Sequence, residues 1–324
     1  SEMCIRDRNH GLYATLYSFP AMMKRNLMKG SVIPRYSGLP TVLKENGYYN
    51  LFFMTHEGQY DNMNAFFRTN GYDEVFSQEN YPADKVVNSF GVQDDFLYEY
   101  AIPVLNQRAA TGQPFFATLP SISNHPPYVI PPFFHPKTSE PETQIVEYAD
   151  WALRQFFEEA RKQPWFDNTI FVLEGDHGKL VGDAECELPE SYNHIPLMIY
   201  SSRIQPEEKT TFGGQVDIQP TILGLLNIDY LQNNFGVDLL KEERPCMFYT
   251  ADNMVVGRND TLLYLYNYET QQELTYDIGN GKLNAVPMDD SFLPLKEYSF
   301  SMLQSAEFLV KHGKTLNSIP FTQQ

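Results

Sequence analysis

An aspartate and a histidine stand next to each other between two glycines, directly after a strand-like run. The run covers residues 169–173, and the tetrapeptide GDHG, with Asp176 and His177, occupies residues 175–178. A carboxylate oxygen and an imidazole nitrogen are both suited to zinc or manganese, and glycines let a loop approach an ion closely. In the alternative, purely structural interpretation, Asp176 caps the next turn. The position after a buried strand favours a metal site.

Three further histidines lie beside apolar runs of strand length. His56 follows residues 49–55, His125 follows residues 114–119, and His194 begins the run 194–200. In open parallel sheets, ligands bind at the carboxyl ends of the strands. We therefore expect Asp176, His177, His125 and His56 to surround one cleft, which His194 joins only through the loop before its strand. Taken alone, His194 also fits a hydrogen-bonded core histidine.

The elements that must position these residues alternate between strand and helix patterns. Strands at 49–55, 114–119, 169–173 and 194–200 are separated by helical patterns at 61–69, 94–110 and 142–162, and a helix at 217–226 follows. The order predicts an α/β fold with a doubly wound, mostly parallel sheet and helices on both faces. Apolar spacing also predicts a helix over residues 11–29, kinked or restarted at Pro20.

The pattern changes after about Pro245. Two strands at 261–268 and 273–278 and a final helix at 295–312 predict a small C-terminal α+β subdomain. We accordingly divide the chain into residues 1–8, a catalytic domain at 9–244 and a subdomain at 245–324.

Composition excludes several classes of protein. The chain has 24 Lys and Arg against 41 Asp and Glu, a net charge of −17, which makes nucleic acid an unsuitable partner. Three cysteines without a CxxC spacing support neither a disulfide framework nor a thiolate zinc site. There is no apolar run long enough to cross a bilayer.

The histidines and the GDHG motif described above occur in an order that resembles the sulfatase family of the alkaline phosphatase superfamily. The segment 217–228 (DIQPTILGLLNI) adds to the resemblance. The similarity is closest to its lipoteichoic-acid-synthase-like, phosphoglycerol transferase branch, and it covers about residues 9–278. The resemblance implies that Asp176 and His177 bind the catalytic divalent ion, manganese or zinc, with magnesium or calcium also open. It also implies that His125 contacts the substrate and that His194 is a substrate-binding or accessory metal residue. His56, the remaining member of the pattern, is expected to bind substrate.

Two departures from the family pattern lie near the start of the chain. The family's Thr nucleophile would be expected at Arg8, and an acidic metal ligand ending the first strand would lie further upstream. Residues 1–8 resemble the translated end of an adapter used in transposase-based sequencing libraries. We therefore expect natural sequence to start at Asn9, within a longer protein, and this chain to be inactive by itself. The arginine that binds glycerol phosphate in the family also has no clear match at 56–64.

The resemblance implies a metal-dependent hydrolase of phosphate or sulfate esters, or a phosphoglycerol-type transferase, that acts on cell-envelope substrates, with lipid-linked substrates also open. It also implies an extracytoplasmic protein, anchored in the membrane through a segment upstream of this chain. A catalytically inactive relative that binds an envelope glycan or lipid headgroup is the alternative from another class. A soluble α/β protein whose GDHG is structural is a third.

Overall fold

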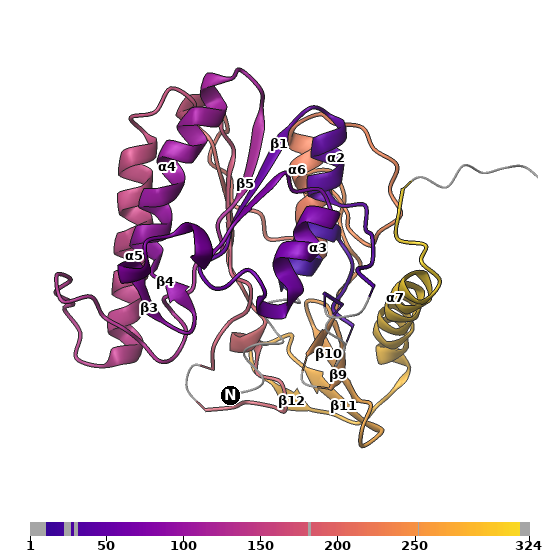
Figure 1. Ribbon diagram of the computed structural model, residues 1–324. Helices are drawn as coiled ribbons and strands as arrows, with labels where there is room; N and C mark the ends of the chain where they lie inside the picture. Colours follow the sequence, from indigo (N-terminus) through magenta and orange to yellow (C-terminus); the bar gives the residue numbers. More distant parts are fainter. Residues whose placement is uncertain (1–10, 23–26, 29–31, 181–182, 252, 318–324) are drawn as a thin grey trace, which may run out of the picture. The chain divides into compact units, whose positions relative to one another are not determined.

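The computed structural model describes residues 11–22, 27–28, 32–180, 183–251 and 253–317 (Figure 1). The chain divides into two compact units, and each is described by itself. The α/β unit comprises residues 40–170 and 200–205, and the second unit comprises residues 1–39, 171–199 and 206–324.

A three-stranded parallel sheet forms the centre of the α/β unit. Its order is β2 (Glu74–Phe76), β1 (Tyr49–Phe53) and β5 (Phe115–Thr118), and Phe52 of β1 lies opposite Val75 and Thr118. The apolar side chains of β1 are fully buried, as expected for a strand covered on both faces. Because β1 and β5 run parallel, the segments that follow them leave the sheet at the same edge.

Helices cover both sides of this sheet. In Figure 1, α4 (Asp94–Ala110) and α5 (Pro141–Ala160) lie on one side of β1 and β5, and α2 (Leu39–Glu45) and α3 (Met63–Thr69) lie on the other. Helical periodicity explains the burial, since α5 buries Ile145, Tyr148 and Ala152 while its intervening residues face solvent. Proline at the first position of α5 suits a helix start, where no N–H partner is needed.

Short elements connect the strands to the helices of the α/β unit. They are the 3₁₀ turns Tyr60–Asn62, Gln78–Asn80, Ala83–Lys85 and Phe166–Asn168 and the hairpin of β3 (Val86–Asn88) with β4 (Gly91–Val92). Asp61 and Asn62 take positive φ angles of 50° and 62°.

In the second unit, β6 (Phe171–Glu174) pairs with β7 (Leu197–Tyr200), and α6 (Ile218–Leu225) follows. Residues 11–17 are helical, but the helix expected over 11–29 does not continue through residues 18–22. Ser18 turns the chain with a φ of 54°, and its N–H donates to the carbonyl of Ala14. The strand expected from His194 begins three residues later, because the N–H of His194 donates to the carbonyl oxygen of Glu190 and holds this residue against the preceding 3₁₀ turn, Glu190–Tyr192.

The end of the chain forms a five-stranded antiparallel sheet with one helix. The order is β12 (Asn284–Ala285), β11 (Gln272–Asp277), β10 (Leu262–Asn267), β9 (Met254–Arg258) and β8 (Met247–Ala251), and α7 (Leu293–Lys311) packs against β8 and β9. Alternate residues of β10 enter different cores, since Leu263 and Leu265 pack with Leu188 whereas Tyr264 packs with Leu295 of α7. The sheet is therefore buried on both faces.

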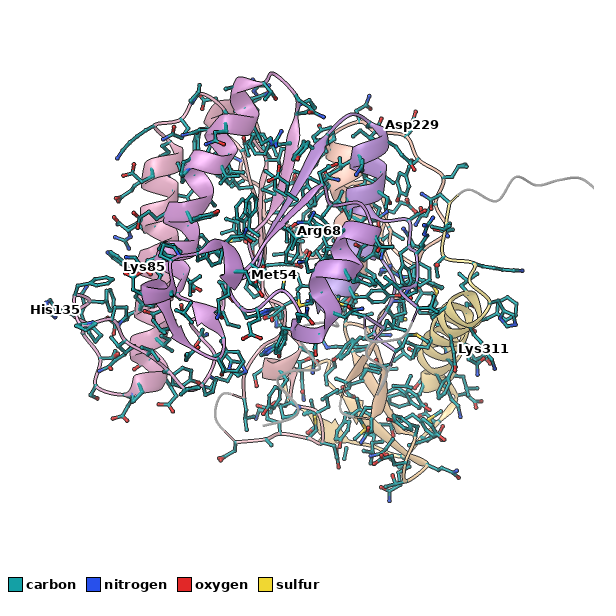
Figure 2. The ribbon with its side chains drawn as sticks, in the orientation of Figure 1. Met54, Arg68, Lys85, His135, Asp229 and Lys311 are labelled. Carbon is teal, nitrogen blue, oxygen red and sulfur yellow. The ribbon has the colours of Figure 1, made fainter. Side chains whose placement is uncertain are left out.

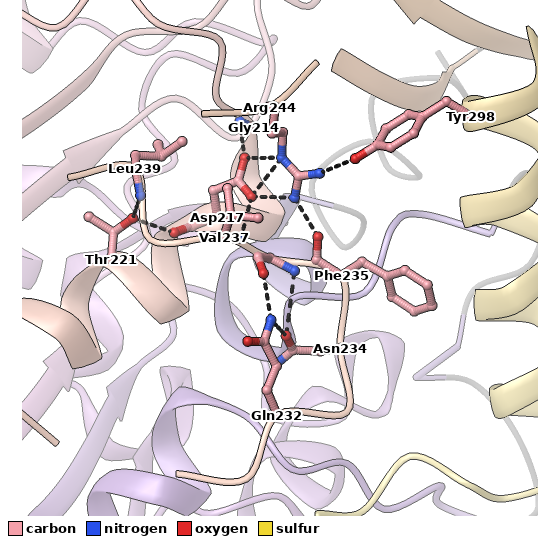
Figure 3. Close-up of polar contacts among 11 residues, drawn as sticks. Gly214, Asp217, Thr221, Gln232, Asn234, Phe235, Val237, Leu239, Arg244 and Tyr298 are labelled. Carbon is pink, nitrogen blue, oxygen red and sulfur yellow. Dashed lines mark hydrogen bonds and ion pairs between the residues drawn. The ribbon is translucent and has the colours of Figure 1, made fainter. Parts of the chain in front are cut away.

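A buried ion pair joins several segments of the second unit (Figure 3). The guanidinium Nε of Arg244 donates to both carboxylate oxygens of Asp217 at 2.9 and 2.8 Å, and its Nη1 donates to the hydroxyl of Tyr298 on α7 at 3.0 Å. The carboxylate also accepts the N–H groups of Gly214 and Val237, each at 2.9 Å. Both side chains of the pair are almost completely buried.

The expected α/β class with a parallel sheet and covering helices is confirmed. The helix expected at 94–110 is α4 with the same bounds, and those expected at 142–162 and 295–312 are α5 and α7 within two residues at each end. The division into 1–8, 9–244 and 245–324 stays a prediction, and residues 1–8 lie outside the described part.

Candidate metal and substrate site

The GDHG segment begins directly after β6, as the sequence predicts. Asp176 and His177 are partly exposed, and Oδ2 of Asp176 lies 3.9 Å from Nε2 of His177. Oδ1 of Asp176 accepts the N–H of His177 at 3.0 Å. The two side chains therefore present an oxygen and a nitrogen to the same small volume.

The protonation of His177 fits a metal ligand. Its Nδ1 lies 2.7 Å from the carbonyl oxygen of Gly178. Because a carbonyl oxygen only accepts, Nδ1 must carry the proton, and the neutral ring then keeps its lone pair on Nε2. A histidine ligand held by a hydrogen bond from its other nitrogen is the usual arrangement at metal centres. The donor types and this tautomer suit zinc or manganese.

Neighbouring segments hold the backbone of this loop. Nε2 of Gln215 donates to the carbonyl oxygens of Gly175 at 3.1 Å and Asp176 at 2.8 Å. A Cβ atom on Gly178 would lie 2.0 Å from the carbonyl oxygen of Ser191, so only glycine permits this approach. Gly178, the second glycine of GDHG, thus allows the loop to pack closely against the segment that leads to His194.

Glu174, the last residue of β6, is a further acidic group beside the motif. Burial, as the largest cause, and the nearby charge of Asp176 raise the pKa of its carboxyl to about 8, while a hydrogen bond from Thr15 acts in the opposite direction. A carboxyl with this pKa is mostly protonated at neutral pH, and it adds little negative charge there.

In the α/β unit, His56 and His125 both lie against the β3–β4 hairpin. The ring centroids of His125 and Phe90 are 4.3 Å apart. A Cβ atom on Gly91, whose φ is 92°, would lie 1.7 Å from the carbonyl oxygen of Thr55 and 2.9 Å from Cα of His56. The hairpin therefore links the segment after β1 with the segment after β5.

A hydrogen bond orients His125, and a ring contact packs His56. Nδ1 of His125 donates to the carbonyl oxygen of Pro126 at 2.6 Å, which leaves Nε2 as the unprotonated nitrogen of the neutral ring. His56 is buried, and its ring lies 4.2 Å from the ring of Tyr60. The segment before His125 is anchored by Asp94, whose Oδ1 accepts the N–H groups of Ile122 at 2.8 Å and Ser123 at 3.1 Å.

The five predicted residues are therefore distributed over both units. Asp176, His177 and an exposed His194 belong to the second unit, while His56 and His125 belong to the α/β unit. Their assembly into one cleft stays a prediction. Within the described residues, no group of three or more His, Cys, Asp or Glu side chains is arranged to hold a metal ion.

Several supporting residues were not predicted from sequence. Gln215 lies beside the recognised segment at 217–228, but nothing in its type signals a bond to GDHG. Gly91 and Phe90 lie between weak strand patterns, and their contacts depend on tertiary structure. Glu174 had a signal, since an acidic residue that ends an apolar strand is unusual.

Comparison with known proteins identifies the family. A model of the sulfatase family matches residues 9–228, which is more than half of the chain. The chain belongs to the sulfatase family. This confirms the resemblance on which the roles of Asp176, His177 and His125 were based, although the roles themselves are not tested by it.

Curated relatives of this sulfatase-family chain include lipoteichoic acid synthases. It is 26% identical over 270 residues to lipoteichoic acid synthase 1 of Bacillus subtilis, with 76% of this chain and 40% of the relative covered. It is also 26% identical over 235 residues to a lipoteichoic acid synthase of Staphylococcus saprophyticus, with 64% of this chain and 35% of the relative covered. The chain thus spans less than half the length of these relatives.

Solved structures support the same placement. A protein in the alkaline phosphatase superfamily from Vibrio parahaemolyticus has a TM-score of 0.82 at 27% identity, with 93% of this chain and 75% of that chain covered. The lipoteichoic acid synthase LtaP from Listeria monocytogenes has a TM-score of 0.80 at 20% identity, with 94% and 80% covered, and it shows likeness of fold alone.

The remaining expectations concern the start of the chain and the membrane. Arg8, where the nucleophile of the family would be expected, lies outside the described residues. Among the helices of the described part of the chain, none combines the length and apolar character needed to cross a bilayer.

Proposed function

We propose that this chain is part of a metal-dependent enzyme that transfers or hydrolyses phosphoryl or sulfuryl esters of the cell envelope. The observation that carries the proposal is the GDHG loop at the end of β6, where Asp176 and His177 present one oxygen and one unprotonated nitrogen 3.9 Å apart. The family, whose members act on sulfate or phosphate esters, supports this reaction class.

Asp176 and His177 would hold the divalent ion, manganese or zinc. When bound, such an ion acidifies a hydroxyl group and draws charge from the ester oxygens. Gln215 and Gly178 keep the two ligands in place through the backbone. Two protein ligands are fewer than the three of a usual catalytic zinc site, so a further ligand from outside the described residues is part of the proposal.

The histidines would act on the substrate. His125 can accept a hydrogen bond from the ester at Nε2 or, when protonated, give a proton to the leaving oxygen. His56 and His194 would bind ester or leaving-group oxygens, His56 from the segment after β1 and His194 from the loop before β7. This assignment requires the strand-end segments of both units to face one cleft.

The whole protein would work outside the cytoplasmic membrane, tethered there by a segment not included in these residues. Support comes from the named relatives, which are lipoteichoic acid synthases. We further propose that residues 9–244 form the catalytic domain and that residues 245–324 form a subdomain. The nucleophilic hydroxyl would come from a residue outside the described part, where Arg8 now stands.

The turnover test compares the chain with its Asp176→Ala variant on an aryl phosphate and an aryl sulfate, with manganese or zinc added. Metal binding without turnover in the chain, together with turnover once a Thr-containing upstream segment is restored, supports the proposal. Metal-dependent turnover by the chain itself that is lost in the variant would retain the reaction class but contradict the position of the nucleophile.

The non-catalytic alternative is decided by the same experiment. Tight metal binding with no turnover of either ester, even with the upstream segment restored, would contradict the proposed enzyme and favour a protein that only binds an envelope glycan or headgroup.

A further inference from the structure

Aromatic side chains form a cluster at the surface of the α/β unit, where the loop after His125 packs against α5. The ring centroid of Trp151 lies 5.7 Å from those of Phe133 and Phe134, and the ring centroid of Tyr148 lies 5.5 Å from that of Phe134. Tyr148 is completely buried, Trp151 is partly exposed and Phe133 is 57% exposed. Isolated apolar side chains are ordinary at a protein surface, whereas contiguous exposed apolar groups are typical of interaction sites.

Hydrogen bonds hold the loop that carries these phenylalanines, both at its tip and on its return to α5. The N–H of Phe134 donates to the carbonyl oxygen of Pro131 at 3.0 Å and closes a turn. The N–H groups of Lys137 and Thr138 donate to the carboxylate of Glu147 on α5, each at 2.8 Å. The exposed ring is therefore presented on an ordered backbone, which lowers the entropy cost of binding a partner.

The charge of this part of the sequence differs from that of the whole chain. Residues 100–139 contain no Asp or Glu, although the chain has 41 of them. The loop itself, residues 126–137, carries one positive side chain, that of Lys137, and no negative one. A net charge of −17 repels anionic surfaces, and this repulsion is weakest where acidic residues are missing. The loop can therefore approach a surface that the rest of the chain avoids.

The placement of the loop favours a lipid bilayer as the partner. Figure 2 shows His135 at the outer end of the loop, which projects outward past α5. A bilayer receives projecting apolar side chains without a matching cavity, and aromatic rings settle at the boundary between its headgroups and acyl chains. Glu140 and Glu142, at the beginning of α5, disfavour an anionic surface. A surface of zwitterionic lipid therefore fits this loop best.

We propose that Phe133, Phe134 and Trp151 dock into the interface of a zwitterionic lipid bilayer. The inference rests on the proposed function for its role only. Because the loop begins directly after His125, docking would bring this histidine close to the surface in which a lipid-linked ester lies. Docking itself requires neither the catalytic ion nor turnover.

The test uses the full chain with a synthetic lipid anchor at its N-terminus, on phosphatidylcholine vesicles whose acyl chains carry bromine. The anchor replaces the proposed tether and gives the loop a high effective concentration at the surface. Bromine quenches tryptophan emission only at close range. The chain has two tryptophans, and Trp165 is only 7% exposed, with its Nε1 donating to Asn106 at 2.7 Å. Quenching by the lipid therefore reports on Trp151.

The Phe133→Ser variant removes the exposed ring, and Phe308→Ser on α7 is the matched control, because Phe308 is 51% exposed. We expect the emission of the unaltered chain to be quenched, and this quenching to be absent from Trp151→Phe. The docking constant obtained from the quenching should fall about tenfold in Phe133→Ser, because the ring no longer leaves water, and stay unchanged in Phe308→Ser. Added salt should not weaken docking, since apolar burial drives it.

No quenching of the unaltered chain would overturn the inference, as would equal docking of Phe133→Ser and Phe308→Ser. Gel filtration without vesicles examines a protein partner. A dimer that dissociates in Phe133→Ser but not in Phe308→Ser would show that the cluster joins two copies of the chain instead. Circular dichroism verifies that each variant is folded. The quenching involves neither ester nor turnover, so failure of the proposed enzyme activity leaves this result unchanged.

Discussion

At the scale of single residues, the candidate metal site depends on side chains that hold the loop as much as on the two ligands. Gln215 is not one of the two proposed ligands, yet its side-chain amide donates to the carbonyl oxygens of Gly175 and Asp176. Residues that orient a metal ligand commonly change metal affinity by about 10–100-fold when they are removed. Gln215 is therefore a positioning residue of the proposed site.

We predict that Gln215→Ala weakens binding of manganese or zinc by about tenfold while the chain stays folded, because both carbonyl groups then lose their donor. Calorimetric titration measures the affinity, and circular dichroism monitors the fold. Gln107→Ala, at an exposed position of α4, is the control. Equal affinities of the two variants would show that Gln215 does not position the loop.

The residues of the candidate site could be selected from the sequence, but their surroundings could not be predicted. Asp176, His177, His56 and His125 follow runs of strand length, so local pattern and the rule for parallel sheets suffice to select them. The bond from Gln215 and the approach of Gly91 to Thr55 join segments about 40 residues apart, and no local pattern encodes them. The side chain of His194 faces solvent ahead of β7, so its role depends on parts of the fold that no local pattern specifies.

At the scale of elements, the β3–β4 hairpin is the feature that both predicted substrate residues of the α/β unit, His56 and His125, contact. Phe90 in its two-residue tip contacts the ring of His125, and Gly91, the first residue of β4, lies against the backbone of His56. Strands of two or three residues are too short to be recognised from sequence, whereas the long helices α4, α5 and α7 were predicted within two residues. Length and periodicity account for this difference.

We predict that Gly91→Ala destabilises the chain by more than Gly47→Ala does. Both glycines have positive φ, 92° and 83°, so both variants lose similar backbone freedom. Only at Gly91 would the new Cβ meet another atom, since nothing lies within 4 Å of the corresponding position at Gly47. Urea unfolding measures the difference, for which we expect about 1–3 kcal/mol.

The same pair of variants tests whether the hairpin positions the histidines. In Gly91→Ala, the NMR signals of the His56 and His125 rings should shift, and in Gly47→Ala they should not. Unchanged ring signals in both variants would show that the hairpin has no part in placing these side chains.

At the scale of the whole molecule, the buried pair of Asp217 and Arg244 connects the segment matched by the sulfatase-family model to the C-terminal part of the second unit. Asp217 lies within residues 9–228, whereas Arg244 and its partner Tyr298 lie beyond them. The segment 217–228 was recognised from sequence as part of the family pattern, but its aspartate has a structural role here. Its partner is 27 residues away in sequence, which no motif indicated.

We predict that Arg244→Met destabilises the chain by about 3–5 kcal/mol, because it leaves the Asp217 carboxylate buried without its counter-charge. The double variant Asp217→Asn with Arg244→Met should recover part of this loss, since no unpaired charge then remains. Thermal and urea unfolding of the two variants provide the comparison. If the double variant is no more stable than Arg244→Met, the cost does not come from the unpaired charge.

The central claim is that Asp176 and His177 bind the divalent ion of a sulfatase-family ester enzyme, and metal titration tests it most directly. Binding of manganese and zinc is measured for the chain, for Asp176→Asn and for His177→Ala, with Asp183→Asn and His135→Ala as controls at exposed positions. We predict one weak site that is lost in both ligand variants and retained in both controls, and a tighter site once an upstream segment with a third ligand is restored. Equal metal binding by the ligand variants and the controls would contradict the account.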